Sequence, residues 1–172
     1  MNQINFSEEY PFTGKSWDRG KGIRINYVDE GEGPTIVCVH GNPTWSFHFR
    51  HMIRGLSTMN RVIAIDHVGC GLSDRPSPDQ YGYRLADRID DLEGLLDHLG
   101  IEENATLLAH DWGGAIGFGA AGRNPDRFSH LVAVNTAAFP LQPGMSFPPI
   151  LGPARGPLGK WLICQLNTFL LG

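Results

Sequence analysis

Short apolar or alternating runs recur between residues 22 and 135, with amphipathic patterns between them. Runs of this length, rich in Val, Ile, Leu and Ala, are typical of strands. We expect strands over residues 22–28, 35–39, 61–65, 105–109 and 131–135. Because helical patterns separate several of these strands, their connections are crossovers, which join parallel strands. The pattern predicts an α/β fold with a mostly parallel sheet and flanking helices.

The strongest helical pattern covers residues 84–99, where leucine and isoleucine recur at intervals of three and four residues before Gly100. That spacing gives a helix one apolar face, and glycine is common just beyond a helix end. The segment also contains five acids: Asp87, Asp90, Asp91, Glu93 and Asp97. Nothing marks them as converging on one metal ion, so we expect all five on a solvated outer face.

A second helix is expected over residues 113–123, where glycine and alanine dominate and allow close packing against a sheet. The composition changes after Pro140, because prolines and glycines crowd residues 140–157 and an apolar stretch follows at 158–171. Such a change is typical of a new structural element. We therefore expect the N-terminal part of a core over residues 1–137 and the beginning of a lid over residues 138–172.

The composition narrows the class of protein. The 172 residues are 41% apolar and carry a net charge of −4, with no basic patch for nucleic acid or an anionic membrane. The N-terminus lacks the features of a secretion signal, and no apolar run approaches the ~20 residues of a membrane span. Cys38, Cys70 and Cys164 suggest neither a disulfide framework nor a thiolate metal site. We expect a soluble cytoplasmic protein, of an oligomeric state that the sequence leaves open.

Residues 105–114 read ATLLAHDWGG, a predicted strand that runs through a tight turn into a predicted helix. This order matches the nucleophile elbow, G-x-S-x-G, with Asp111 as the nucleophile and with Ala109 and Gly113 in the two small positions. Small residues are needed there because the turn is sharp and the residue at its tip is strained. An Asp between a strand and a helix is also a common N-cap, so this motif alone leaves both roles open.

A second motif, HGNPTW at residues 40–45, directly follows the predicted strand at 35–39. In α/β-hydrolases the loop after this strand contributes one N–H of the oxyanion hole, and the residue after the nucleophile contributes the other. Those residues here are Asn42 and Trp112, while His40 and Gly41 shape the loop. Both motifs in the correct strand order favour a catalytic role for Asp111.

These motifs and residues 66–74, DHVGCGLSD, resemble the haloalkane dehalogenase family of the α/β-hydrolase superfamily over nearly all of residues 20–140. Two shorter segments, GCGLSD at residues 69–74 and NTAAFP at residues 135–140, are similar to its third subfamily. That subfamily overlaps with the β-lactone decarboxylases of olefin biosynthesis. The resemblance implies that Asp111 displaces a leaving group from an sp³ carbon and forms an ester. It also implies that the Trp112 indole and the Asn42 amide hold the departing group, without a cofactor or metal. The expected partner is a small apolar substrate.

Members of this family hydrolyse the ester with a late His that activates water and with an acid that orients this His. The segment NTAAFP, where some members place the acid, contains none, and the seven histidines have other expected places in motifs, on helices or at the surface. We therefore expect both groups beyond Gly172. On this interpretation the chain is an N-terminal fragment that does not turn over alone.

Hydrolytic cleavage of a carbon–halogen bond is the first expectation, and decarboxylation of a β-lactone is the alternative that shares the same residues. Epoxide hydrolases have a similar elbow, but their lids carry tyrosines that residues 140–172 lack. A nucleotide-binding module is disfavoured because Asp74 stands where the fingerprint that starts at Gly69 needs its third glycine. An inactive remnant that only binds apolar ligands is the alternative without catalysis.

Overall fold

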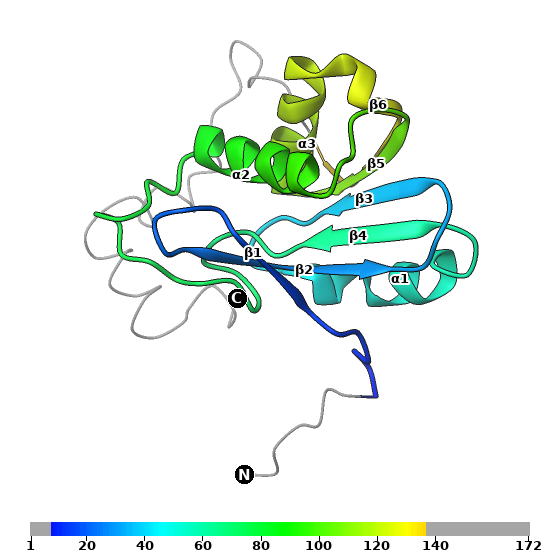
Figure 1. Ribbon diagram of the computed structural model, residues 1–172, viewed down its shortest axis with the longest axis horizontal. Coiled ribbons are helices and arrows are strands. Elements are labelled where there is room, and N and C mark those ends of the chain that lie inside the picture. The colour runs from blue at the N-terminus through cyan, green and yellow to red at the C-terminus, as the bar shows by residue number, and fades with distance from the viewer. Residues whose placement is uncertain (1–7, 137–172) are drawn as a thin grey trace, which may run out of the picture. The chain divides into compact units, whose positions relative to one another are not determined.

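A six-stranded sheet organises residues 8–136, the part of the chain that the computed structural model describes (Figure 1). The strands lie in the order β1-β2-β4-β3-β5-β6. The pairs β3–β4, β3–β5 and β5–β6 are parallel, whereas β1–β2 and β2–β4 are antiparallel. The predicted α/β fold is confirmed. The strand bounds are Lys15–Asp18 for β1, Arg24–Glu30 for β2, Thr35–Val39 for β3, Arg61–Ile65 for β4, Ala105–His110 for β5 and Phe128–Val134 for β6.

All the predicted strands are present, but some of their ends differ from the prediction. β2 begins at Arg24 rather than at residue 22, because Gly22 has a φ of +70°, outside the strand region. β6 begins at Phe128, earlier than predicted, since the polar Ser129 and His130 interrupt the apolar pattern without leaving the sheet. The sequence pattern does not predict β1, because KSWD is mostly polar and exposed, as an edge strand can be.

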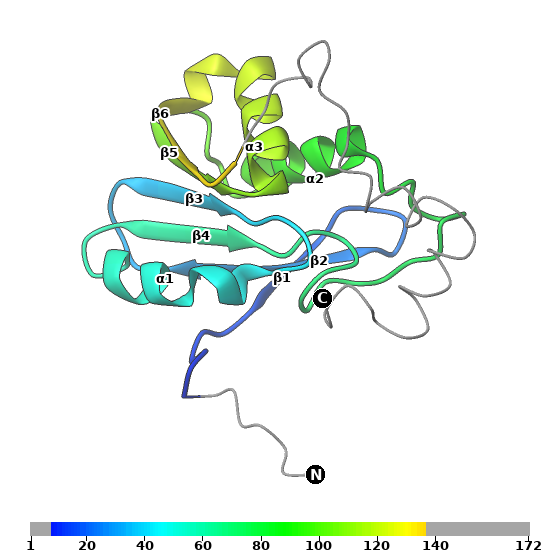
Figure 2. The same ribbon diagram turned by 180° about the vertical axis from the view of Figure 1, so that it is seen from behind.

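Helices cover both faces of the sheet (Figures 1 and 2). α1, Arg50–Leu56, lies on one face, while α2, Leu85–His98, and α3, Trp112–Arg123, lie together on the other. Two short 3-10 helices, η1 Ser46–Phe49 and η2 Pro125–Arg127, lead into α1 and β6. The sequence predicts α2 and α3 almost to the residue, whereas α1 is too short to show a clear period.

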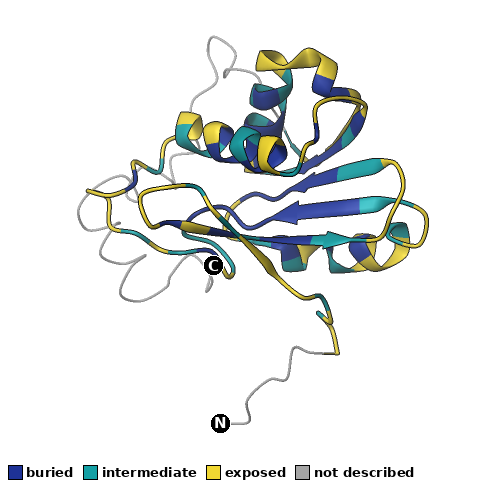
Figure 3. Ribbon diagram, viewed as in Figure 1, coloured by how far each residue is buried: buried dark blue, intermediate teal, exposed yellow. Residues whose placement is uncertain are grey.

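The sheet divides the apolar core in two, because successive residues of a strand point to opposite faces. On β3, Val37 and Val39 join the cluster that packs against α2 and α3, and Cys38 joins the cluster that packs against α1. The central strands form most of the buried interior, drawn dark blue in Figure 3. Packing on both faces therefore fixes the strands that lead into the loops described below.

The small residues of α3 permit close packing, as the sequence predicts. A Cβ at Gly117 would lie 2.9 Å from a methyl carbon of Leu107 on β5. A Cβ at Gly119 would lie 2.5 Å from the terminal carbon of Ile89 on α2. A larger residue at either position would require Leu107 or Ile89 to shift, so glycine at both positions permits the observed packing.

Asp91 of α2 does not face solvent, so the prediction of a solvated outer face was wrong for this acid. It is 2% exposed, and its carboxylate accepts hydrogen bonds from the Tyr81 hydroxyl, at 2.6 Å, and from Nε of Arg19. Burial raises the pKa of Asp91, and these two partners act against that rise. The pattern fails here because both partners lie outside the helix and leave no trace in its periodicity.

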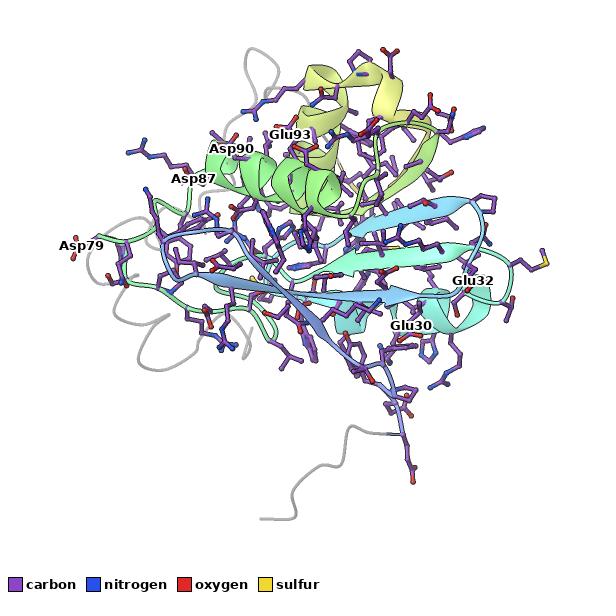
Figure 4. All side chains as sticks on the ribbon, in the orientation of Figure 1. Glu30, Glu32, Asp79, Asp87, Asp90 and Glu93 are labelled. Carbon is purple, nitrogen blue, oxygen red and sulfur yellow. The ribbon has the colours of Figure 1, made fainter. Side chains whose placement is uncertain are left out.

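The other acids of α2 lie at or near the surface, and Figure 4 labels three of them along the helix. Nη1 of Arg123, on α3, donates hydrogen bonds to Asp90 at 2.6 Å and to Glu93 at 2.7 Å. Arg127 forms a salt bridge with Asp97. These ion pairs link α2 to α3 and to the segment after it, although exposed pairs contribute little stability each.

The chain divides after Ala138 into a first unit, residues 1–138, and a second unit, residues 139–172. The second unit lies outside the described residues, and so does Cys164. The predicted lid at residues 138–172 therefore stays a prediction.

Candidate active site

Two loops meet where β3 and β5 end. The strands are parallel neighbours, and Val39 of β3 lies opposite Ala109 of β5. The carboxyl ends of parallel strands share one edge of a sheet, where open α/β sheets bind their ligands. This register brings residues 40–42 beside Asp111, although the two segments are far apart in the sequence.

Asp111 occupies the tip of a strained turn between β5 and α3. Its backbone has φ 54° and ψ −129°, a conformation that residues with a side chain rarely adopt. Its carbonyl oxygen accepts hydrogen bonds from the N–H of Gly114, at 3.0 Å, and from the Thr136 hydroxyl. The residue also caps the N-terminus of α3, where the helix dipole stabilises negative charge. Strain that the surroundings hold in place is typical of functional sites.

The carboxylate of Asp111 lies against the backbone of the loop that follows β3. Its Oδ1 accepts a hydrogen bond from the backbone N–H of Asn42 at 3.0 Å. A Cβ at Gly41 would lie 2.0 Å from the same oxygen. Gly41 therefore leaves room for the carboxylate, and the backbone N–H of Asn42 binds it.

The two small positions of the predicted elbow are tightly enclosed. Ala109 is fully buried, and a Cβ at Gly113 would lie 2.0 Å from the carbonyl oxygen of Val39. Neither residue has room for a larger side chain. The turn can approach β3 this closely only because both positions are small.

A cavity of about 290 Å³ lies beside this turn. The loop after β3 supplies one wall, and the beginnings of α2 and α3 supply others. The predicted site residues His40, Gly41, Asn42 and Trp112 line this single space, and Trp112 is 56% exposed. The remaining lining residues are His67, Tyr83, Leu85, Arg88 and Ile116.

His40 joins two loops beneath the cavity. Its Nδ1 donates a hydrogen bond to the Gly41 carbonyl oxygen at 2.7 Å, and its Nε2 accepts one from the backbone N–H of His67 at 3.0 Å. The His67 ring donates from Nε2 to the His40 carbonyl oxygen at 3.1 Å. Burial lowers the pKa of His40 to about 4 and also lowers the pKa of His67. Both rings are therefore neutral near pH 7.

In the described part of the chain, no histidine is directly bonded to the side chain of Asp111. Across residues 8–136, no histidine forms a hydrogen bond with the Asp111 carboxylate, and His48 and His110 stack on each other with ring centroids 4.2 Å apart. The expected general base beyond Gly172 remains a prediction.

Asp66 is a part of the site's framework that the sequence motifs did not single out. It is fully buried and accepts hydrogen bonds from the backbone N–H of Ser46, at 2.8 Å, and of Leu72, at 2.9 Å. The side chain of Asn26 donates a third, at 3.0 Å. Asp66 thereby ties the loop after β3 to the loop after β4. An acid directly after an apolar strand was the available signal.

Three helical residues line the cavity that sequence reasoning did not place there. Leu85 and Arg88 line it from α2, and Ile116 lines it from α3. Arg88 lies three residues after Leu85 and four before Leu92, so it shares the apolar face of the helix. An arginine on an apolar face was the signal that could have identified it.

Two further properties concern residues 8–136 alone. No three His, Cys, Asp or Glu side chains in this part of the chain gather as metal ligands would. None of its helices is both long enough and apolar enough to cross a membrane.

Known proteins match the chain in sequence and in structure. A family model described as alpha/beta hydrolase fold matches residues 34–162. A cis-3-alkyl-4-alkyloxetan-2-one decarboxylase of Shewanella oneidensis is 47% identical over 149 residues, which are 86% of this chain and 47% of the relative. Haloalkane dehalogenase 2 of Mycobacterium tuberculosis is 41% identical over 131 residues, 76% of this chain and 44% of the relative. The crystal structure of haloalkane dehalogenase DatA from Agrobacterium tumefaciens matches with a TM-score of 0.79 and 31% identity, over 92% of this chain and 55% of that one.

The chain spans about half the length of the curated relatives that it matches. The predicted likeness to haloalkane dehalogenases and β-lactone decarboxylases is confirmed, since an alkyloxetan-2-one is a β-lactone. The sheet order, the turn at Asp111 and the family match agree with one another. On this evidence, the chain belongs to the alpha/beta hydrolase fold family.

Proposed function

We propose that the Asp111 carboxylate attacks an sp³ carbon of an apolar substrate and forms a covalent ester. The observation that carries the proposal is the hydrogen bond from the Asn42 N–H to Oδ1 of Asp111, at the tip of a strained turn beside a cavity. In the reaction a bond forms between a carboxylate oxygen and carbon. The bond from that carbon to the leaving group breaks, and the leaving group keeps the electron pair.

The residue types suit this chemistry. A carboxylate is ionised near neutral pH and needs no base before it attacks, unlike a serine hydroxyl. We propose that the side-chain amide of Asn42 and the indole N–H of Trp112 stabilise the leaving group. Both residues line the cavity beside Asp111. Neutral donors in a partly dry cavity can stabilise a departing anion without forming a permanent ion pair with the nucleophile.

The substrate is either a haloalkane, cleaved hydrolytically, or a β-lactone, which is decarboxylated. The motifs do not separate the two substrates, because both activities share Asp111, Trp112 and Asn42, whereas the identity of 47% to a decarboxylase against 41% to a dehalogenase favours the lactone. Both substrates present, within an apolar molecule, an electrophilic sp³ carbon that is bonded to a leaving group. We propose the same first step for both, because the same carboxylate can attack either carbon.

Hydrolysis of the ester requires an activated water, and we propose that the activating base lies outside residues 8–136. The 172-residue chain alone would then be alkylated by a haloalkane without rapid turnover. Incubation with 1-bromohexane should add one hexyl group, measured as an increase in intact mass, and peptide mapping should place it on Asp111. The Asp111→Asn variant should stay unmodified. Modification at another residue, or equal modification of the variant, would contradict the proposal.

A further inference from the structure

Arg88 brings a cation into the wall of the cavity. It lies on α2 and shares the cavity lining with Leu85 of the same helix and with Asn42 and Trp112. One of its guanidinium nitrogens, Nη1, is buried and has no hydrogen-bond partner among the described residues. A buried charge without a partner is costly, so such groups are usually paired.

Other arginines that touch the core have a carboxylate partner, whereas Arg88 has none within residues 8–136. Arg61 binds Asp29 at 2.8 Å, and Arg19 forms a salt bridge with the buried Asp91. The structure gives Arg88 no corresponding pair in the described part of the chain. No ion pair within residues 8–136 therefore explains why Arg88 lies on the apolar face of α2.

Two carboxylates lie near Arg88, but Asp66 accepts its hydrogen bonds from Ser46, Leu72 and Asn26, and Asp111 accepts one from the N–H of Asn42. The other titratable groups around Arg88 carry no negative charge. Burial lowers the pKa of His40 and His67, so both are uncharged near pH 7. Burial also raises the pKa of the Cys70 thiol, although Arg88 acts in the opposite direction, so this thiol stays protonated. His67 lines the same cavity, and its Nδ1 is buried without a hydrogen-bond partner among the described residues. The cavity therefore contains a positive charge that is available to a ligand.

We propose that Arg88 binds the carboxylate that a β-lactone releases when its ring opens. The inference rests on the proposed function of Asp111. When an Asp111 oxygen bonds to the sp³ ring carbon next to the ring oxygen, the bond between that carbon and the ring oxygen breaks. The electron pair moves to the ring oxygen, and the former lactone carbonyl becomes part of a carboxylate. The negative charge thus passes from Asp111 to the substrate, and Arg88 lies in the same cavity to stabilise it.

This role makes Arg88 a residue that selects the leaving group. A departing halide is a single atom that two neutral N–H donors can hold, whereas a carboxylate has two oxygens that match the fork of a guanidinium. A charge-assisted hydrogen bond to a carboxylate is among the stronger polar contacts.

The test measures anion binding without the nucleophile, so that it is independent of ester formation. In an Asp111→Asn background, calorimetry compares decanoate, an apolar chain with a carboxylate, with decanol, its neutral analogue. We expect decanoate to bind at least tenfold more tightly than decanol. Adding Arg88→Met should abolish that preference and leave decanol binding within twofold, and Arg88→Lys should restore part of the preference.

Arg84→Met is the matched control, because Arg84 is exposed on the same segment, carries the same charge and does not line the cavity. It should keep the preference for decanoate. The proposal is overturned if the preference is missing in the Asp111→Asn background, survives in Arg88→Met, or falls equally in Arg84→Met. If bromohexane fails to alkylate Asp111 while Arg88 still sets the preference, the ester mechanism fails and the carboxylate site stands. If Asp111 is alkylated but the preference for decanoate is missing, the ester mechanism stands and the carboxylate site at Arg88 fails.

Discussion

The backbone N–H of Asn42 donates to Oδ1 of Asp111 over 3.0 Å, so the loop after β3 orients the carboxylate through its main chain. The side chain of Asn42 is not used in this bond: the residue lines the cavity, and its Oδ1 accepts a hydrogen bond from the Cys70 thiol, with Sγ and Oδ1 3.9 Å apart. One residue can therefore orient the nucleophile with its backbone and contact a leaving group with its amide. Substitutions at this site should separate the two functions.

Gly41→Ala should strongly slow the proposed attack of Asp111 on the substrate carbon. The added Cβ would lie 2.0 Å from Oδ1 and 2.6 Å from Cγ of Asp111, so the carboxylate has to move. A displacement of about 1 Å commonly costs about a hundredfold in rate. We expect alkylation by 1-bromohexane, followed by intact mass, to slow by at least that factor.

Gly55→Ala is the control for this substitution. Gly55 lies in α1, and a Cβ there would meet nothing within 4 Å. Alanine in a helix is favoured over glycine by about 0.5–1 kcal/mol, so the unfolding midpoint should rise slightly and the alkylation rate should not change. A similar loss of rate in both variants would show that the effect of Gly41→Ala is not local.

Trp112→Phe should slow alkylation while the protein stays folded. The substitution keeps an aromatic ring and removes the indole N–H that we propose to hold the leaving group. Loss of one such donor costs about 10²–10³-fold in comparable sites. Since Trp112 is 56% exposed, the free energy of unfolding in urea should change by less than about 1 kcal/mol. An unchanged alkylation rate would remove the indole from the mechanism.

The sequence predicted the fold and the site to different extents. Periodicity identified both long helices and every strand of the described sheet except the polar edge strand β1, because apolar spacing is a local property. The elbow at Asp111 and the loop at Asn42 were predicted for a similar reason, since short motifs record local geometry.

Partners that are far apart in the sequence were not predicted. Asp91 was expected in solvent because Tyr81 and Arg19 lie outside its helix. The exposure of Arg88 to the cavity follows from how α2 packs, which the helix alone does not determine. Long-range packing therefore set the parts of the site that the motifs missed.

Thr136→Val should loosen the turn at Asp111. The Thr136 hydroxyl donates to the Asp111 carbonyl oxygen in a partly buried position, and valine keeps the shape without the donor. Loss of one such bond costs about 1 kcal/mol of unfolding free energy, and more where the acceptor stays unpaired. Thr58→Val removes a similar but exposed bond, to the Gly55 carbonyl oxygen at 3.0 Å, and should cost less because water replaces it. Equal losses in urea unfolding would contradict a special role for Thr136.

Stability should fall as the pH is lowered from about 6.5 to about 4, because of His40. Burial lowers the pKa of His40 to about 4 in the folded protein, against an ordinary value of about 6.5 in the unfolded chain. Between these values the unfolded chain binds a proton that the folded protein does not, so acid favours unfolding. Each pKa unit corresponds to about 1.4 kcal/mol, so the free energy of unfolding should fall by roughly 3 kcal/mol between about pH 6.5 and about pH 4.

The lowered pKa values of His48 and His67 act in the same direction. The raised pKa of the buried Asp91 acts in the opposite direction, because the folded protein binds that proton more readily than the unfolded chain. The lowered pKa values of Asp29 and Asp74 cost stability only below about pH 4, beneath this window. Urea unfolding at intervals from pH 7.5 to 4.5 measures the slope. The free energy of unfolding of His40→Asn should be lower at pH 7.5 and should change less with pH. The control is His51→Asn, at an exposed position on α1, whose free energy of unfolding should change with pH as in the original protein. An unchanged slope in His40→Asn would mean that other groups cause the acid sensitivity, because the proton excluded by burial would then not be that of His40.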